Sequence, residues 1–61
     1  MYILFDKPNS RNTAWEALDN AFGTERFSKE DAVSALVRAG VGNEYEAFAR
    51  LVRDGYATEV D

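Results

Sequence analysis

The chain has 61 residues, a formal net charge of −4, and neither Cys nor His. At this length it forms a single domain, residues 1–61, which buries only about 60% of the surface that its unfolded form exposes. Without Cys and His the chain lacks disulfides and the commonest metal ligands, so we expect no cofactor, and its acidic charge opposes non-specific binding to nucleic-acid phosphates.

The chain begins with a short apolar run, Tyr2-Ile3-Leu4-Phe5. Such a run predicts a β-strand that is buried on both faces. The first helix is expected to begin near Asn12 or Thr13, because Thr13 and Glu16 have the spacing of a capping box. Gly23 is expected to end this helix as its C-terminal cap.

The second helix begins after Ser28, which has the residue type and position of an N-terminal cap, with Asp31 at the return position of the box. The turn that follows contains Gly40 and Gly42 on either side of Val41. Glycine tolerates the positive φ angles that a tight link between crossing helices requires. We expect Val41 to dip between the helices and contact the core.

The third helix is expected over residues 44–54. Glu46 precedes Arg50 by four residues, which favours a surface ion pair. Gly55 then lets the chain reverse into a strand over residues 56–60. The inner stripe of this helix is predicted at Tyr45, Phe48, Ala49 and Val52.

Each of the two strands needs a partner for its backbone groups. The strand at residues 2–5 is therefore expected to pair with the strand at residues 56–60, and Phe27 to form a short β-bridge. The predicted fold class is α+β, with three helices packed on a small antiparallel sheet. The predicted core consists of Leu4, Trp15, Leu18, Phe22, Val33, Leu36, Val37, Val41, Phe48, Val52 and Tyr56.

Neither a membrane segment nor an enzyme is indicated by the sequence. No apolar run approaches the roughly 20 residues that cross a bilayer. The apolar run at the start of the sequence is too short for the apolar region of a signal peptide, and no basic residues precede it. We therefore expect a cytoplasmic protein. No imidazole is available to activate Ser10, Ser28 or Ser34, and no phosphate-binding glycine loop or calcium loop is present. We therefore expect no enzymatic activity.

The order helix, tight turn, helix, strand over residues 27–60 resembles the winged helix-turn-helix superfamily. The passage from Phe48 through Gly55 to Val60 is similar to the family's transition from recognition helix to wing strand. The resemblance implies a nucleic-acid-associated protein, such as an accessory or regulator of transcription, that contacts duplex DNA weakly. The basic residues that would contact DNA are Arg50, Arg53, Arg38 and Lys29.

Two features depart from the family's pattern. The strand at residues 2–5 can replace the missing second wing strand, but it leaves no wing loop. The groove-facing end of the recognition helix carries Glu44 and Glu46, which would repel phosphate. The alternative is a protein-interaction or dimerisation module without DNA binding, whose partner surface is formed by Tyr2, Ile3, Leu4 and Phe5. In that case Arg50 and Arg53 belong to a solvated, ion-paired face.

Overall fold

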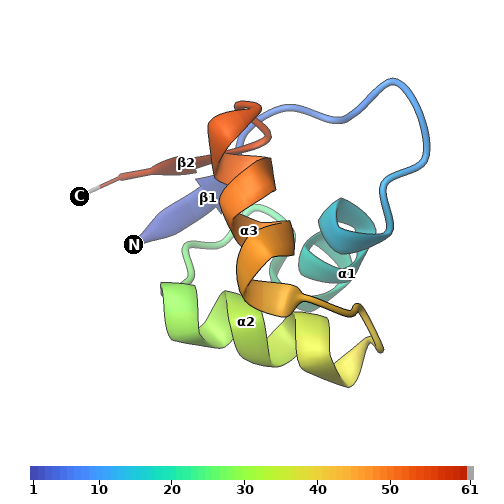
Figure 1. Ribbon diagram of the computed structural model, residues 1–61. Coiled ribbons are helices and arrows are strands. Elements are labelled where there is room, and N and C mark those ends of the chain that lie inside the picture. Colours follow the sequence, from blue (N-terminus) through green and yellow to red (C-terminus); the bar gives the residue numbers. More distant parts are fainter. Residues whose placement is uncertain (61) are drawn as a thin grey trace.

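The computed structural model describes residues 1–60. Three helices and two short strands follow one another along the chain (Figure 1). Their order is β1 (Tyr2–Leu4), α1 (Thr13–Phe22), α2 (Lys29–Arg38), α3 (Glu44–Arg53) and β2 (Ala57–Glu59). This confirms the predicted small α+β domain.

The sheet joins the two ends of the chain. Strands β1 and β2 pair antiparallel, with Tyr2 opposite Glu59 and Leu4 opposite Ala57. On its other side, Tyr2 forms an antiparallel bridge with Phe27, so β1 lies between Phe27 and β2. The predicted strand pairing and the predicted bridge are both confirmed, although each strand is shorter than expected.

Two side-chain caps begin the first two helices. The Oγ of Ser28 accepts a hydrogen bond from the N–H of Asp31 at 3.0 Å, as predicted for α2. At α1 the cap is Asn12, whose Oδ1 accepts from the N–H of Trp15 at 3.0 Å. The capping box predicted at Thr13 is therefore wrong, because the N–H of Glu16 donates instead to the carbonyl of Asn12 at 2.9 Å and the helix begins one residue earlier with a one-sided cap.

The cap of α1 leads to a stability prediction. We expect Asn12→Ala to lower the free energy of unfolding by about 1 kcal/mol, because the N–H of Trp15 loses its acceptor. The neighbouring substitution Thr13→Ala removes no cap, so its effect should stay within about 0.5 kcal/mol. Urea unfolding followed by circular dichroism measures both. Equal losses for the two variants would contradict the assignment of the cap to Asn12.

The turn between α2 and α3 uses positive φ at two positions. Gly40 has φ 79°, as the sequence predicts, but the second position is Asn43, with φ 52°, and not Gly42. Asn is among the few non-glycine residues that adopt this conformation readily. Val41 is half-buried and packs against the core, as expected.

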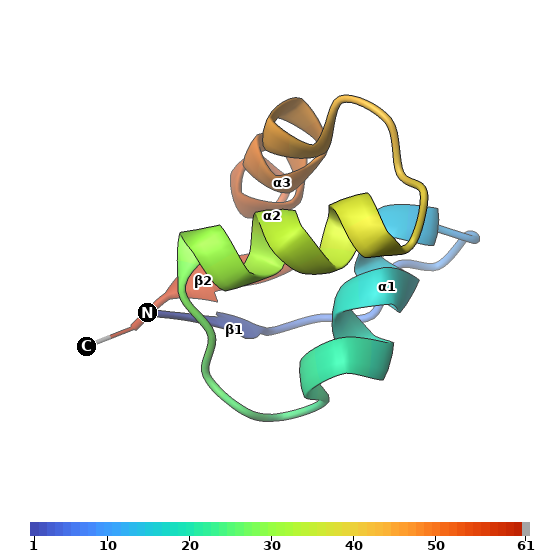
Figure 2. The same ribbon diagram turned by 90° about the horizontal axis from the view of Figure 1, so that it is seen from below.

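The core lies between α3 on one side and α1 and the strands on the other, and α2 closes it from below (Figure 1 and Figure 2). Its largest fully buried side chains are Phe27, Phe48, Leu18 and Leu36. The prediction for Val37 is wrong, because this residue is 54% exposed. Among the residues that the predicted core omitted, four are at most 2% exposed: Phe27, Ala32, Leu51 and Ala57.

Strand β1 is covered on one face only. The ring of Tyr2 meets that of Phe48 edge-on, with centroids 5.0 Å apart, and Leu4 also packs against the core. Ile3 lies on the opposite face by strand alternation, and Phe5 is 70% exposed. The expectation of a strand buried on both faces is therefore wrong, since the three helices cover only one side of so small a sheet.

Candidate interaction surface

A hollow of about 300 Å³ lies along α3 on the side that faces the start of α2. We call it the α2–α3 groove, and its lining combines apolar and basic side chains. The buried ring of Phe48 and the half-buried Tyr2 and Val52 contribute its apolar surface. The complete lining is Tyr2, Lys29, Tyr45, Phe48, Ala49, Val52 and Arg53.

The shape of the groove follows from a regular spacing on α3. Tyr45, Ala49 and Arg53 are four residues apart, so they lie on one stripe of the helix. The small side chain of Ala49 stands between two large ones, and this difference in size leaves the hollow. The stripe spans about 12 Å at 1.5 Å per residue.

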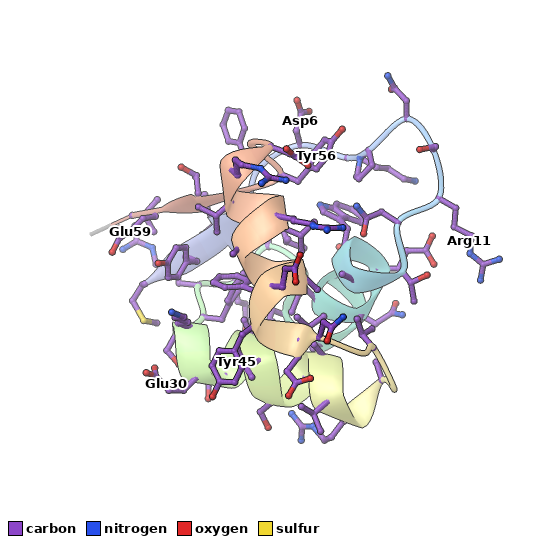
Figure 3. All side chains as sticks on the ribbon, in the orientation of Figure 1. Asp6, Arg11, Glu30, Tyr45, Tyr56 and Glu59 are labelled. Carbon is purple, nitrogen blue, oxygen red and sulfur yellow. The ribbon has the colours of Figure 1, made fainter. Side chains whose placement is uncertain are left out.

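Tyr45 is the most exposed part of this surface. Its side chain projects from the first turn of α3 in front of α2, on the side where Glu30 lies (Figure 3). It is 65% exposed, although the apolar periodicity placed it on the inner stripe of the helix. A second hollow of about 310 Å³ adjoins Tyr45 and is lined by Lys29, Glu30, Val33, Ser34 and Tyr45.

Two basic side chains, Lys29 and Arg53, line the groove. Among residues 1–60, no carboxylate lies within ion-pair distance of Lys29. The Nε of Arg53 lies 3.7 Å from Oδ1 of the adjacent Asp54, and both side chains are largely exposed. Exposed pairs of this kind contribute little stability, so both cations remain available to an incoming anion.

The other two predicted DNA-contacting residues lie elsewhere. Nη2 of Arg50 donates to Oε1 of Glu46 at 2.9 Å, which confirms the predicted ion pair. Arg50 does not line the α2–α3 groove. It lines two other hollows, one with Gly42 and one with Asn12. Arg38 ends α2, roughly 13 Å along the axis from Lys29 at 1.5 Å per residue. The structure thus brings together Lys29 and Arg53 only.

Two carboxylates, Glu44 and Glu46, occupy the first turn of α3. Negative charge at a helix N-terminus is favourable because the helix dipole is positive there. Among the described residues, Asn43 makes no side-chain cap hydrogen bond at this terminus. Their position is favourable for the helix, and any DNA phosphate approaching this end of α3 would meet their charge.

The predicted partner surface at Tyr2, Ile3, Leu4 and Phe5 is divided between two faces. Tyr2 and Leu4 point toward the core, and Tyr2 also lines the α2–α3 groove. Ile3 and Phe5 lie on the outer face of the sheet. A partner surface on this outer face stays a prediction.

The free edge of β2 is largely closed to a further strand. The N–H of Phe5 donates to the carbonyl of Tyr56, and the N–H of Val60 to the carbonyl of Met1. Since ladder bonds alternate, the backbone groups of Ala57 and Glu59 point away from β1. Ala57 is only 1% exposed, so its outward groups are covered. Glu59 alone remains accessible, with a charge that discourages edge pairing.

The other site classes can be described within residues 1–60. No group of three or more His, Cys, Asp or Glu side chains in this range is placed to hold a metal ion. None of the helices formed by these residues has the length and apolar character needed to cross a membrane. Comparison with protein-family models, curated proteins and solved structures finds no match for the chain.

Proposed function

We propose that this protein is a non-enzymatic interaction module that binds a short segment of a partner protein in the α2–α3 groove. The observation that supports it best is an open apolar groove with an exposed tyrosine beside it. A large aromatic side chain with a polar tip is the type of residue that dominates binding at protein interfaces. Tyr45 has this character, and no other aromatic side chain of α3 is exposed.

The dimensions of the groove favour a peptide segment as its occupant. A volume of about 300 Å³ is at the lower end of the range for small-molecule sites, so it suits one or two side chains. A stripe of about 12 Å on α3 accommodates three to four residues of extended chain at about 3.3 Å each. A folded partner would reach this site through an exposed loop or terminus.

Duplex DNA is the second candidate, and the arrangement of α2, the tight turn and α3 is what favours it. The resemblance to winged helix-turn-helix proteins stays a prediction, and with it the roles of Arg38 and Arg50. DNA affinity depends on several phosphate contacts made together. The separation of Arg38 and Arg50 from Lys29 and Arg53 supports a protein partner over DNA. A cytoplasmic location remains a prediction from the sequence.

Filling the groove tests the proposal without removing any contact. We expect Ala49→Leu to abolish binding of peptides selected from a random-sequence display library, because the larger side chain occupies the hollow between Tyr45 and Arg53. Leucine is a good helix former, and Ala49 is exposed, so the fold should tolerate the change. Fluorescence anisotropy with the selected peptides measures the affinity.

Ala21→Leu is the matched control, since Ala21 is exposed on α1, away from the groove. It should bind the peptides as the unaltered protein does. Equal binding by Ala49→Leu, or no selected peptide at all, would contradict the proposed function. Titration with a DNA duplex at low salt separates the two candidates. Binding to DNA that Ala49→Leu leaves unchanged, and that Arg50→Ala and Arg53→Ala weaken, would favour the second.

A further inference from the structure

The charges around the α2–α3 groove differ in sign from those of the molecule as a whole. The chain carries 11 carboxylates against seven basic residues, yet the groove is lined by Lys29 and Arg53 and by no carboxylate. Lys29 comes from the first residue of α2 and Arg53 from the last residue of α3. The two cations therefore line one groove only because of how the helices pack.

Lys29 lies at the N-terminus of α2, which also carries two carboxylates. The first turn of a helix presents N–H groups and the positive end of the helix dipole. In α2 this end is occupied by Ser28, which accepts from Asp31, and by the carboxylates of Glu30 and Asp31. Neither carboxylate lines the groove, although Glu30 shares the neighbouring hollow with Lys29.

The geometry points to an acidic partner segment: we infer that the α2–α3 groove binds a short stretch with one large apolar side chain flanked by Asp or Glu. The apolar side chain lies over Ala49 beside Tyr45. The flanking carboxylates pair with Lys29 and Arg53. This inference rests on the proposed function and specifies the chemistry of its partner.

Charge complementarity of this kind acts on specificity and on the rate of encounter. The net charge of −4 repels an acidic segment over most of the surface, so the groove would be the place where such a segment is attracted. A basic segment would be drawn instead to the carboxylates of Glu44 and Glu46 and not to the groove. The positive charge of the groove, on a molecule that is negative overall, thus favours an acidic partner and directs it to this site.

Two synthetic peptides with the same single Phe anchor test the inference. One has Asp and Glu on both sides of the anchor, and the other has Asn and Gln at the same positions. We expect the acidic peptide to bind about tenfold more tightly, as two exposed ion pairs allow. The difference should shrink as salt rises from 0.1 M to 1 M, where the Debye length falls from about 10 Å to about 3 Å.

Charge reversal at the groove supplies the matched variants. Lys29→Glu combined with Arg53→Glu should remove the preference and favour a third peptide flanked by Lys. Arg11→Glu combined with Arg38→Glu changes the net charge equally but leaves the groove intact, since Arg11 projects from the loop before α1 (Figure 3). This control should keep the preference for the acidic peptide. Thermal unfolding verifies that both double variants fold.

The possible outcomes separate the inference from the proposed function. Equal affinity for the acidic and the neutral peptide, with both lost in Ala49→Leu, would overturn the acidic partner and leave the interaction module standing. Equal loss of preference in the two charge-reversed proteins would also overturn it, because net charge and not the groove would then be responsible. No binding of any of the three peptides would overturn the inference, and the interaction module would then stand or fall with the library selection.

Discussion

Leu36→Ala should lower the free energy of unfolding by about 2–5 kcal/mol. Leu36 lies on α2 with no exposed surface and belongs to the central core cluster. Its truncation leaves a cavity that the helices around it can close only in part. A core of this size supplies only about 3–5 kcal/mol in total, so a large fraction of the variant should be unfolded at room temperature.

The adjacent residue supplies the control. Val37→Ala also shortens an apolar side chain of α2, but Val37 is 54% exposed, and we expect a change within about 0.5 kcal/mol. Urea unfolding followed by circular dichroism compares the two variants. If Val37→Ala cost as much as Leu36→Ala, Val37 would be buried in solution, and the exposed position described for it would be contradicted.

Phe27→Ala should cost about 3–5 kcal/mol, although Phe27 lies in no helix. Its side chain is 1% exposed, and its ring stacks on that of Phe22 with centroids 4.7 Å apart. Its backbone also exchanges two hydrogen bonds with Tyr2, at 2.7 and 2.9 Å. Those backbone bonds survive the substitution, so the loss measures the packing of the ring.

Phe5→Ala is the same chemical change at an exposed position and serves as the comparison. Phe5 is 70% exposed, so we expect a loss below about 1 kcal/mol. Thermal unfolding under identical conditions compares the midpoints of the two variants. A similar fall in the midpoint for both would show that the ring of Phe5 is covered in solution, and would indicate self-association through the outer face of the sheet.

Stability should also respond to screening of the carboxylate excess, because repulsion among like charges opposes the compact state. The ion pairs between Glu46 and Arg50 and between Arg11 and Glu16 are exposed and contribute little at any salt concentration. The helices therefore depend on their caps and on apolar packing. This is why the substitutions with the largest expected effects lie in the core and not among the charged residues.

Elements that depend on neighbouring residues could be predicted from the sequence. The apolar periodicity and the caps located three helices, and the cap at Ser28 and the stop at Gly23 are found as expected. The ion pair between Glu46 and Arg50 is likewise local, because four residues form one turn of a helix. The pairing of β1 with β2 followed from a simple requirement, since each strand had no other partner for its backbone.

Contacts between distant elements decided the rest. Val33 and Val37 occupy equivalent positions on the inner stripe of α2, but only Val33 is buried, because α3 crosses α2 near its middle (Figure 1). Tyr45 has the spacing of a core residue and is exposed, since its side chain lies in front of α2 and not beneath it (Figure 3). The bridge at Phe27 was predicted, but its partner Tyr2 and the burial of its ring against Phe22 and Phe48 come from contacts between distant elements.

The same limit applies to the candidate site. The sequence by itself identified Lys29 and Arg53 as basic residues on separate helices, and it assigned them with Arg38 and Arg50 to a single function. Only the crossing of α2 and α3 placed Lys29 and Arg53 on one groove and Arg50 outside it. Apolar periodicity predicts which face of each helix is buried. The angle and offset at which two helices pack depend on side chains from both helices, so only the tertiary structure determines them.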